Sequence, residues 1–84
     1  MRRHLLRRMQ GAELIECGVD EGSPADGEKI RDIRWPSGSI LVAHWHGSKV
    51  TVPAADDVIR GGDNVYAVVT RGTRRKFLKL IRKR

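Results

Sequence analysis

Cysteine and long apolar runs are scarce in this chain of 84 residues, and each scarcity excludes a class of protein. The single cysteine, Cys17, excludes a disulfide framework and a cysteine-ligated structural zinc site, and it fits a reducing compartment. No apolar run approaches the roughly 20 residues that cross a bilayer. Residues 1–9 are basic with only Leu5 and Leu6 as an apolar centre, so we expect no signal peptide.

Neither the length of the chain nor its residue patterns favour an enzyme. Its length makes one domain that buries a modest share of its surface, so a deep active site with a lid is not expected. There is no glycine-rich nucleotide-binding motif, and no Ser-His-Asp or Cys-His arrangement is supported. Cys17 falls in a predicted half-buried strand, where a thiol is usually inert. We therefore predict no enzymatic activity.

Acidic residues are missing from both ends of the chain. The net charge of +7 comes from residues 1–10 and 71–84, which hold four and eight basic residues and no acid. The basic C-terminal segment could bind nucleic acid, an anionic membrane surface or an acidic partner, or could simply be a solvated face. Aromatic residues make up only 5% and are not interleaved on a strand, which makes nucleic acid an unlikely partner.

Alternation and turn residues predict the strands. Residues 13–19 have one continuously apolar face, which indicates a strand on a core. Residues 39–46 and 49–52 flank the dipeptide Gly47-Ser48, which is typical of a hairpin. A short strand is expected near Val58, and the nearly all-apolar residues 65–70 predict a central strand.

The tetrapeptide Ser23-Pro24-Ala25-Asp26 predicts the start of a first helix. Ser23 would cap it, the proline would take the first helical position, and Asp26 would complete a capping box. This helix would carry Ile30 and Ile33 on one face and would end before Trp35-Pro36, since the residue before a proline is disfavoured in a helix.

The two ends complete the predicted architecture. Residues 1–12 are expected to be a basic N-terminal arm, a linker remnant or a short helix, and residues 13–84 the domain itself. Thr73 would cap a basic C-terminal helix whose apolar side holds Phe77, Leu78, Leu80 and Ile81. The predicted fold class is α+β, a small and mainly antiparallel sheet with two helices in the order β-α-β-β-β-α.

His44 and His46 are the first candidate for chemistry, because two positions apart on a strand they share one face. Two imidazoles could ligate a metal, but no third ligand follows at a fixed spacing, so no metal site is predicted. The alternative is that both lie on the solvated face while Ala43 and Trp45 pack inward. Asp63 is expected to hydrogen-bond within its turn.

Carboxylates and an arginine near predicted turns are the other candidates. The adjacent Asp56 and Asp57 are expected to cap a turn rather than to act in catalysis. Asp32 and Arg34 lie beside the loop 35–38, where an arginine, a carboxylate and an aromatic ring could form a shallow site for a polar or phosphate-bearing small molecule. A helix-end ion pair that only fixes the turn is the alternative.

Four segments, in order and at matching spacing, are similar to one known family. They are EGSPADGEKI at 21–30, WPSGSILVA at 35–43, VTVP at 50–53 and DVIRGGDNVY at 57–66. On these segments residues 13–82 resemble the TrkA-C domain, the C-terminal domain of regulators of potassium conductance. The resemblance covers about five sixths of the chain.

The resemblance implies a non-catalytic regulatory domain on the cytoplasmic side of a membrane ion transporter or channel subunit, peripheral to the inner face of the membrane. Such domains form homodimers, here expected through the first helix and neighbouring strand edges. In some members a small-molecule regulator such as cyclic di-AMP binds between the two copies. The matching ligand-binding positions in this sequence are Ile30, Asp32, Arg34, Ser39 and Pro53. From the residues alone, a basic module for nucleic acid or acidic surfaces remains the alternative.

Overall fold

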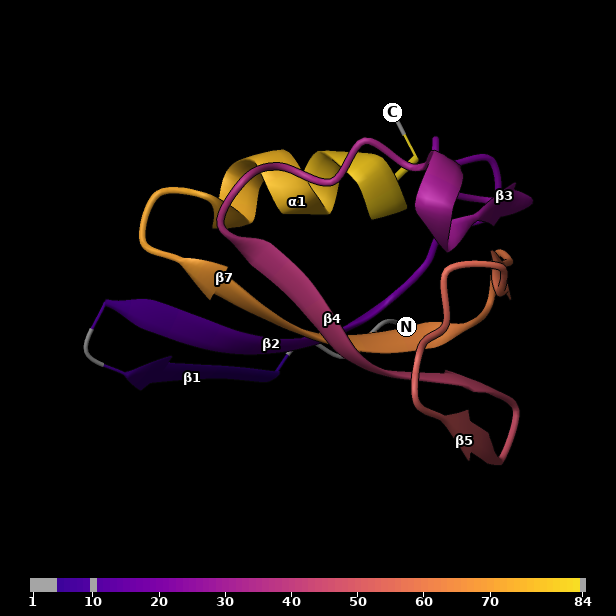
Figure 1. Cartoon of the computed structure of the whole chain (residues 1–84), viewed down its shortest axis with the longest axis horizontal. Helices are drawn as coiled ribbons and strands as arrows, with labels where there is room; N and C mark the ends of the chain where they lie inside the picture. The colour runs from indigo at the N-terminus through magenta and orange to yellow at the C-terminus, as the bar shows by residue number, and fades with distance from the viewer. Residues whose placement is uncertain (1–4, 10, 84) are drawn as a thin grey trace.

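A five-stranded antiparallel sheet covered on one face by a single helix forms the body of the molecule (Figure 1). The computed structural model describes residues 5–9 and 11–83. The order of strands across the sheet is β1-β2-β7-β4-β5. These strands and the helix span Leu5–Met9 (β1), Ala12–Gly18 (β2), Ser39–His46 (β4), Lys49–Thr51 (β5), Asn64–Thr70 (β7) and Arg74–Ile81 (α1).

Strand β7 is central, as its apolar composition predicts, and it holds the core together. It pairs along its whole length with β2 and with most of β4. Every second residue of β7 is fully buried beneath α1, because alternate side chains of a strand point to one face. The fully buried apolar side chains are Ile15, Val19, Ala25, Ile59, Val65, Ala67, Val69, Phe77 and Ile81.

Strand β4 forms the predicted hairpin with β5, but its alternation is broken by a β-bulge. Leu41 and Ala43 pair with consecutive residues of β7, so Val42 is one residue more than the partner strand can match. Beyond the bulge the two faces of β4 are exchanged. Leu41 and His44 therefore face the core, and Ala43 lies on the outer face of the sheet.

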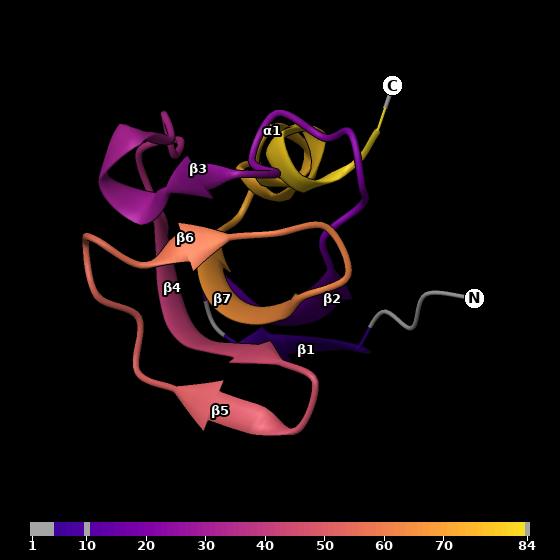
Figure 2. The same ribbon diagram turned by 90° about the vertical axis from the view of Figure 1, so that its right-hand side faces the viewer.

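The prediction of a first helix that starts at Ser23 is wrong. Residues 20–27 form turns, and the segment continues as strand β3 (Glu28–Lys29) and a single 3-10 turn (Ile30–Asp32). Strand β3 pairs with β6 (Val58–Ile59), and Figure 2 shows this small ribbon standing off the main sheet on the side of α1. The pairing with a distant segment outweighs the local helix signal.

Asp26 explains why the capping box does not form. Its carboxylate accepts hydrogen bonds from the backbone N–H groups of Gly22, at 2.9 Å, and Gly61, at 2.8 Å. The hydroxyl of Ser23 is buried and has no hydrogen-bond partner among the described residues. The tetrapeptide therefore ties two loops together instead of starting a helix.

The prediction is wrong for the N-terminal end of the chain and correct for the C-terminal helix. Leu5–Met9 form the edge strand β1 rather than a short helix or an arm, and residues 1–4 lie outside the described residues. The C-terminal helix is confirmed with its predicted apolar side, although Thr73 makes no side-chain cap. The antiparallel α+β class is thus confirmed, with one α-helix instead of two. No helix in the described part of the chain has the length and apolarity to cross a membrane.

Candidate functional site

A groove of about 370 Å³ opens between the 3-10 turn, the start of β4 and the segment after β5. Its walls come from parts of the chain that are far apart in sequence, and the sheet and α1 bring them together. It is lined by Ile30, Trp35, Ser39, Ile40, Leu41, Pro53, Ala54, Ala55 and Phe77. We refer to it as the Trp35 groove.

Three of the five predicted ligand-binding residues meet in the Trp35 groove. They are Ile30, Ser39 and Pro53. Asp32 and Arg34 do not line it, and both are exposed on the 3-10 turn and the residues that follow. The predicted charged pair therefore lies outside the groove, where solvent reaches it freely.

The chemistry of the groove is mainly apolar and aromatic. The ring of Trp35 stacks on that of Phe77, with centroids 5.5 Å apart, and its Nε1–H donates a hydrogen bond to the carbonyl of Ile30 at 3.1 Å. The hydroxyl of Ser39 donates to the carbonyl of Pro36 at 2.7 Å, which leaves its oxygen free to accept. Such a lining favours a flat ligand held by contact area and a few polar groups.

The sequence does not predict several of the residues that line the groove. Ile40, Ala54 and Ala55 carry no chemical signature, and Phe77 was assigned to packing alone. A signal was available for Ile40, because an apolar residue on the open face of a strand is one that a partner or ligand can cover. It is 63% exposed although it lines the groove.

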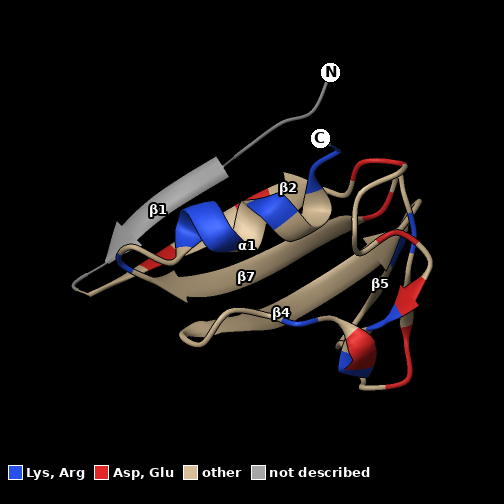
Figure 3. Cartoon of the chain, turned by 90° about the horizontal axis from the view of Figure 1, so that it is seen from above, with Lys and Arg blue, Asp and Glu red and all other residues tan. Residues whose placement is uncertain are grey.

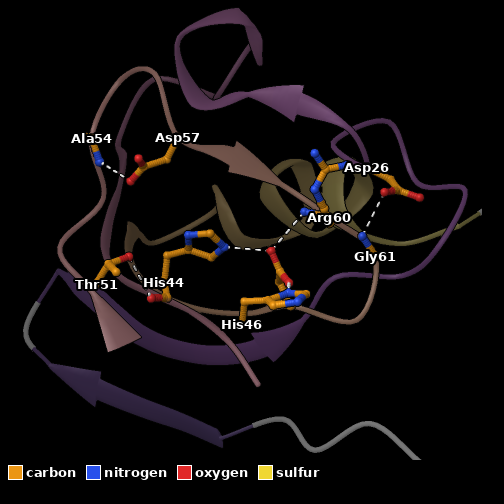
Figure 4. Close-up of polar contacts among 9 residues, drawn as sticks. Asp26, His44, His46, Thr51, Ala54, Asp57, Arg60 and Gly61 are labelled. Atoms are coloured by element: carbon orange, nitrogen blue, oxygen red, sulfur yellow. Dashed lines mark hydrogen bonds and ion pairs between the residues drawn. The ribbon is translucent and has the colours of Figure 1, made fainter. Parts of the chain in front are cut away.

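A second polar cluster joins both histidines to one buried carboxylate (Figure 4). Nε2 of His44 lies 2.7 Å from Oδ2 of Asp63, and Nδ1 of His46 contacts Oδ1 of the same residue. Asp63 is only 1% exposed and also accepts the N–H of Arg60 at 3.0 Å. The prediction that His44 lies on the solvated face is wrong, since the bulge turns it to the core.

The environment of Asp63 keeps it ionised. Burial would raise the pKa of its carboxyl, but hydrogen bonds from His44, His46 and the N–H of Arg60 outweigh burial and hold the pKa below its ordinary value. The turn hydrogen bond expected for Asp63 is present through Arg60.

No group of three side chains within residues 11–83 is arranged to hold a metal ion.

Of the two aspartates in the loop before β6, Asp57 closes a turn as predicted, and Asp56 is exposed. Oδ2 of Asp57 accepts the N–H of Ala54 at 2.9 Å, which closes the turn beside the groove. Asp56 forms an ion pair with Arg31 on the exposed surface. Both contacts position the segment that carries Pro53 and Ala54 against the 3-10 turn.

An apolar surface adjoins the groove on the outside of the hairpin. Ile40 and Val42 of β4 are 63% and 43% exposed, and Val50 of β5 and the following Val52 are 65% and 85% exposed. We call these four residues the β4–β5 apolar surface. Ile40 belongs both to this set and to the lining of the Trp35 groove, so the two features share one side chain.

Comparison with known proteins gives a consistent set of relatives. The sequence profile of the TrkA-C domain matches residues 14–82. The chain is 36% identical over 67 residues to a Trk system potassium uptake protein TrkA homolog of Archaeoglobus fulgidus, and 29% identical over 70 residues to the Trk system potassium uptake protein TrkA of Mycobacterium tuberculosis. These matches cover 80% and 83% of this chain, but only 15% and 32% of the two relatives.

Proposed function

Because the chain belongs to the TrkA-C domain family, we propose that it is a non-catalytic regulatory domain of a potassium transport protein. The proposal takes potassium from the names of the relatives, both of which are Trk system potassium uptake proteins. Its place would be cytoplasmic, against the inner face of the membrane that holds the transporter or channel subunit. There it would bind a small regulator and pair with a second copy of itself.

The observation that carries this proposal is that the Trp35 groove and the β4–β5 apolar surface share Ile40. A ligand in the groove would contact Ile40, and a second copy placed on the apolar surface would contact the same side chain. Exposed apolar side chains gathered on one hairpin are typical of surfaces that a partner covers. Ligand and partner would therefore meet at one residue.

Regulation would follow from linkage between the ligand and the geometry of the dimer. A ligand that binds one dimer arrangement more tightly shifts the population toward it by the ratio of the two affinities. The transport protein would respond because its own states favour different arrangements of the paired domains. No covalent chemistry is required of the domain.

The ligand class that we propose is a nucleobase-bearing phosphate ester, with cyclic di-AMP as the first compound to test. A flat base would lie on the apolar lining beside Trp35 and Ser39. The phosphates would reach outward toward Arg34, which is exposed beside the groove and offers a planar fork of donors. In this arrangement Arg34 would lie at the rim of the groove, and Asp32 would stay outside it as an exposed acid.

The test is a titration of the chain with cyclic di-AMP, ATP and NAD. Tryptophan fluorescence and thermal stability are followed together, because Trp35 lines the groove. We expect saturable binding of one compound with a higher Tm, weakened at least about tenfold by Arg34→Ala. Arg71→Ala is the matched control, since Arg71 is also exposed and does not line the groove. Absence of binding by all three compounds, or equal loss in both variants, would contradict the ligand assignment.

A further inference from the structure

The outward flank of α1 is a concave and strongly basic surface. A hollow of about 630 Å³ runs along the helix and is lined by Arg74, Arg75, Leu78, Lys79, Arg82 and Lys83. Five of these six residues are cationic, and α1 itself contains no acidic residue. Figure 3 shows basic turns along α1, with acidic segments on β2 beside it and in the loop near its C-terminal end, and further acidic segments at the far end of the domain. We call this surface the α1 groove.

Few acidic groups offset these charges. Glu13 lies 3.9 Å from Arg74, and Asp20 accepts the backbone N–H of Lys83 at 3.1 Å. In the described part of the chain, no ion pair involves Arg75, Lys79 or Arg82. Like charges held this close on a short helix repel one another, so an anion that enters between them relieves the repulsion.

We propose that the α1 groove docks the domain on the anionic headgroups of a phospholipid bilayer. The inference rests on the proposed function, because a regulatory domain of a membrane transport protein works beside a membrane. Arginine and lysine are the side chains that hold phosphate groups. Each basic residue that reaches an anionic membrane surface strengthens binding about fivefold.

The contact is one of charge alone, without insertion into the membrane. Of the four apolar residues of α1, Phe77, Leu78 and Ile81 are buried in the core, and Leu80 is partly buried and packs against it. An interfacial helix that inserts needs its apolar face free to enter the lipid. The binding is therefore sensitive to salt, because exposed charges are screened within a Debye length of about 10 Å at 0.1 M salt.

Nucleic acid fits this surface less well than a bilayer. Single strands bind where aromatic side chains and cations share a face, whereas here Trp35 stacks on Phe77, the aromatic residue of α1, which is fully buried. Trp45 and Tyr66 pair on the outer face of the sheet, away from the helix. Helix α1 is also only eight residues long and packs one side on the sheet, so it cannot enter a major groove deeply.

The test is co-sedimentation of the 84-residue chain with vesicles of phosphatidylcholine alone and of phosphatidylcholine mixed equally with phosphatidylglycerol. We expect binding to the anionic vesicles only, weakened strongly between about 50 mM and about 300 mM salt. The variant Arg75→Gln/Lys79→Gln should reduce the affinity by about 20-fold. The variant Lys29→Gln/Lys49→Gln removes the same charge from exposed positions outside the groove and should retain most of the affinity.

Three results would overturn the proposal. They are no binding to anionic vesicles, equal loss of affinity in both variants, and tighter binding to a DNA or RNA oligonucleotide than to the vesicles at the same salt. Circular dichroism of each variant checks that it is folded, which the exposure of all four substituted residues leads us to expect. The vesicle assay needs no nucleotide, and the difference between the two variants reports on α1 rather than on the other basic residues of the chain. Its failure beside a successful ligand titration would therefore remove the docking surface and leave the proposed function intact.

Discussion

Oδ1 of Asp26 accepts the backbone N–H of Gly61 at 2.8 Å, although 35 residues separate the two in sequence. The other oxygen of the same carboxylate accepts the N–H of Gly22 at 2.9 Å. These two backbone hydrogen bonds hold the pKa of Asp26 below its ordinary value of 3.8. One side chain thus fastens the loop before β3 to the loop after β6.

The variant Asp26→Asn should be less stable than the wild type at neutral pH. Asparagine has one acceptor oxygen, so its amide group would oppose one of the two N–H donors. Because the folded pKa is lowered, the stability that Asp26 contributes is fully present above 3.8 and is lost as the pH falls through the folded pKa. We expect urea denaturation to show that the difference in unfolding free energy between the wild type and Asp26→Asn is constant above about pH 5 and becomes smaller in acid. A constant difference down to the lowest pH would contradict this account.

The two histidines should differ sharply in their effect on stability. His44→Ala removes one of the two groups that contact Oδ2 of the buried Asp63 and leaves that oxygen with the N–H of Arg60 alone, which should cost about 1.5–3 kcal/mol of unfolding free energy. The side chain of His46 is 73% exposed, so His46→Ala should cost less than about 1 kcal/mol. Denaturant titration of both variants measures the two losses of unfolding free energy. Equal losses would show that burial of the histidine does not determine how much each contact with Asp63 stabilises the fold.

Gly61 should not accept a side chain. A Cβ at this position would lie 2.6 Å from Cα and 2.9 Å from N of Glu21, both in the backbone. We expect Gly61→Ala to lower the unfolding free energy by about 1–3 kcal/mol, which is the typical cost of adding a methyl group to a tightly packed site in a protein. Adding Glu21→Ala should not restore stability, because the backbone atoms remain. Recovery in the double variant would show that the clash was only with the flexible side chain of Glu21.

The thiol of Cys17 should resist modification in the native protein. Burial raises its pKa to about 12, so very little thiolate is present at neutral pH. Labelling with a thiol reagent such as Ellman's reagent at about pH 8 should be at least about 100-fold slower in buffer than in denaturant. Rapid stoichiometric labelling of the folded chain would contradict the burial of this residue.

Self-association should depend on the β4–β5 apolar surface. Val50→Glu places a charge in that surface and should weaken a dimer at least about tenfold, because the charge would have to be desolvated on pairing. Ser48→Glu puts the same charge in the exposed turn of the same hairpin and should change little. Light scattering over a range of concentrations measures both, and a wild-type chain that stays monomeric at high concentration would remove the dimer from the proposal.

What the sequence predicted correctly depends on local signals. The hairpin of β4 and β5 follows from its two-residue turn, and α1 follows from apolar residues at helical spacing. The central place of β7 follows from its nearly continuous apolar run. In each case neighbouring residues already determine the outcome.

What the sequence could not predict depends on contacts across long stretches of chain. Ser23 and Asp26 match a helix start, yet Asp26 binds Gly61 and strand β3 pairs with β6. In the candidate site, Ile30, Ser39 and Pro53 came from the family resemblance, whereas Ala54 and Ala55 come close only because the loop before β6 folds against the 3-10 turn. Position in space, not residue type, makes them part of the groove.

The bulge at Val42 divides β4 into two halves, and the alternation of inward and outward side chains is reversed between them. Its first half presents Leu41 to the groove and its second half presents His44 to Asp63. Deleting Val42 would join the halves into one regular strand and force one of them to rotate by half a turn. A shortening of one residue would therefore sacrifice either the groove lining or the histidine cluster, so the length of this strand is as strongly constrained as its composition.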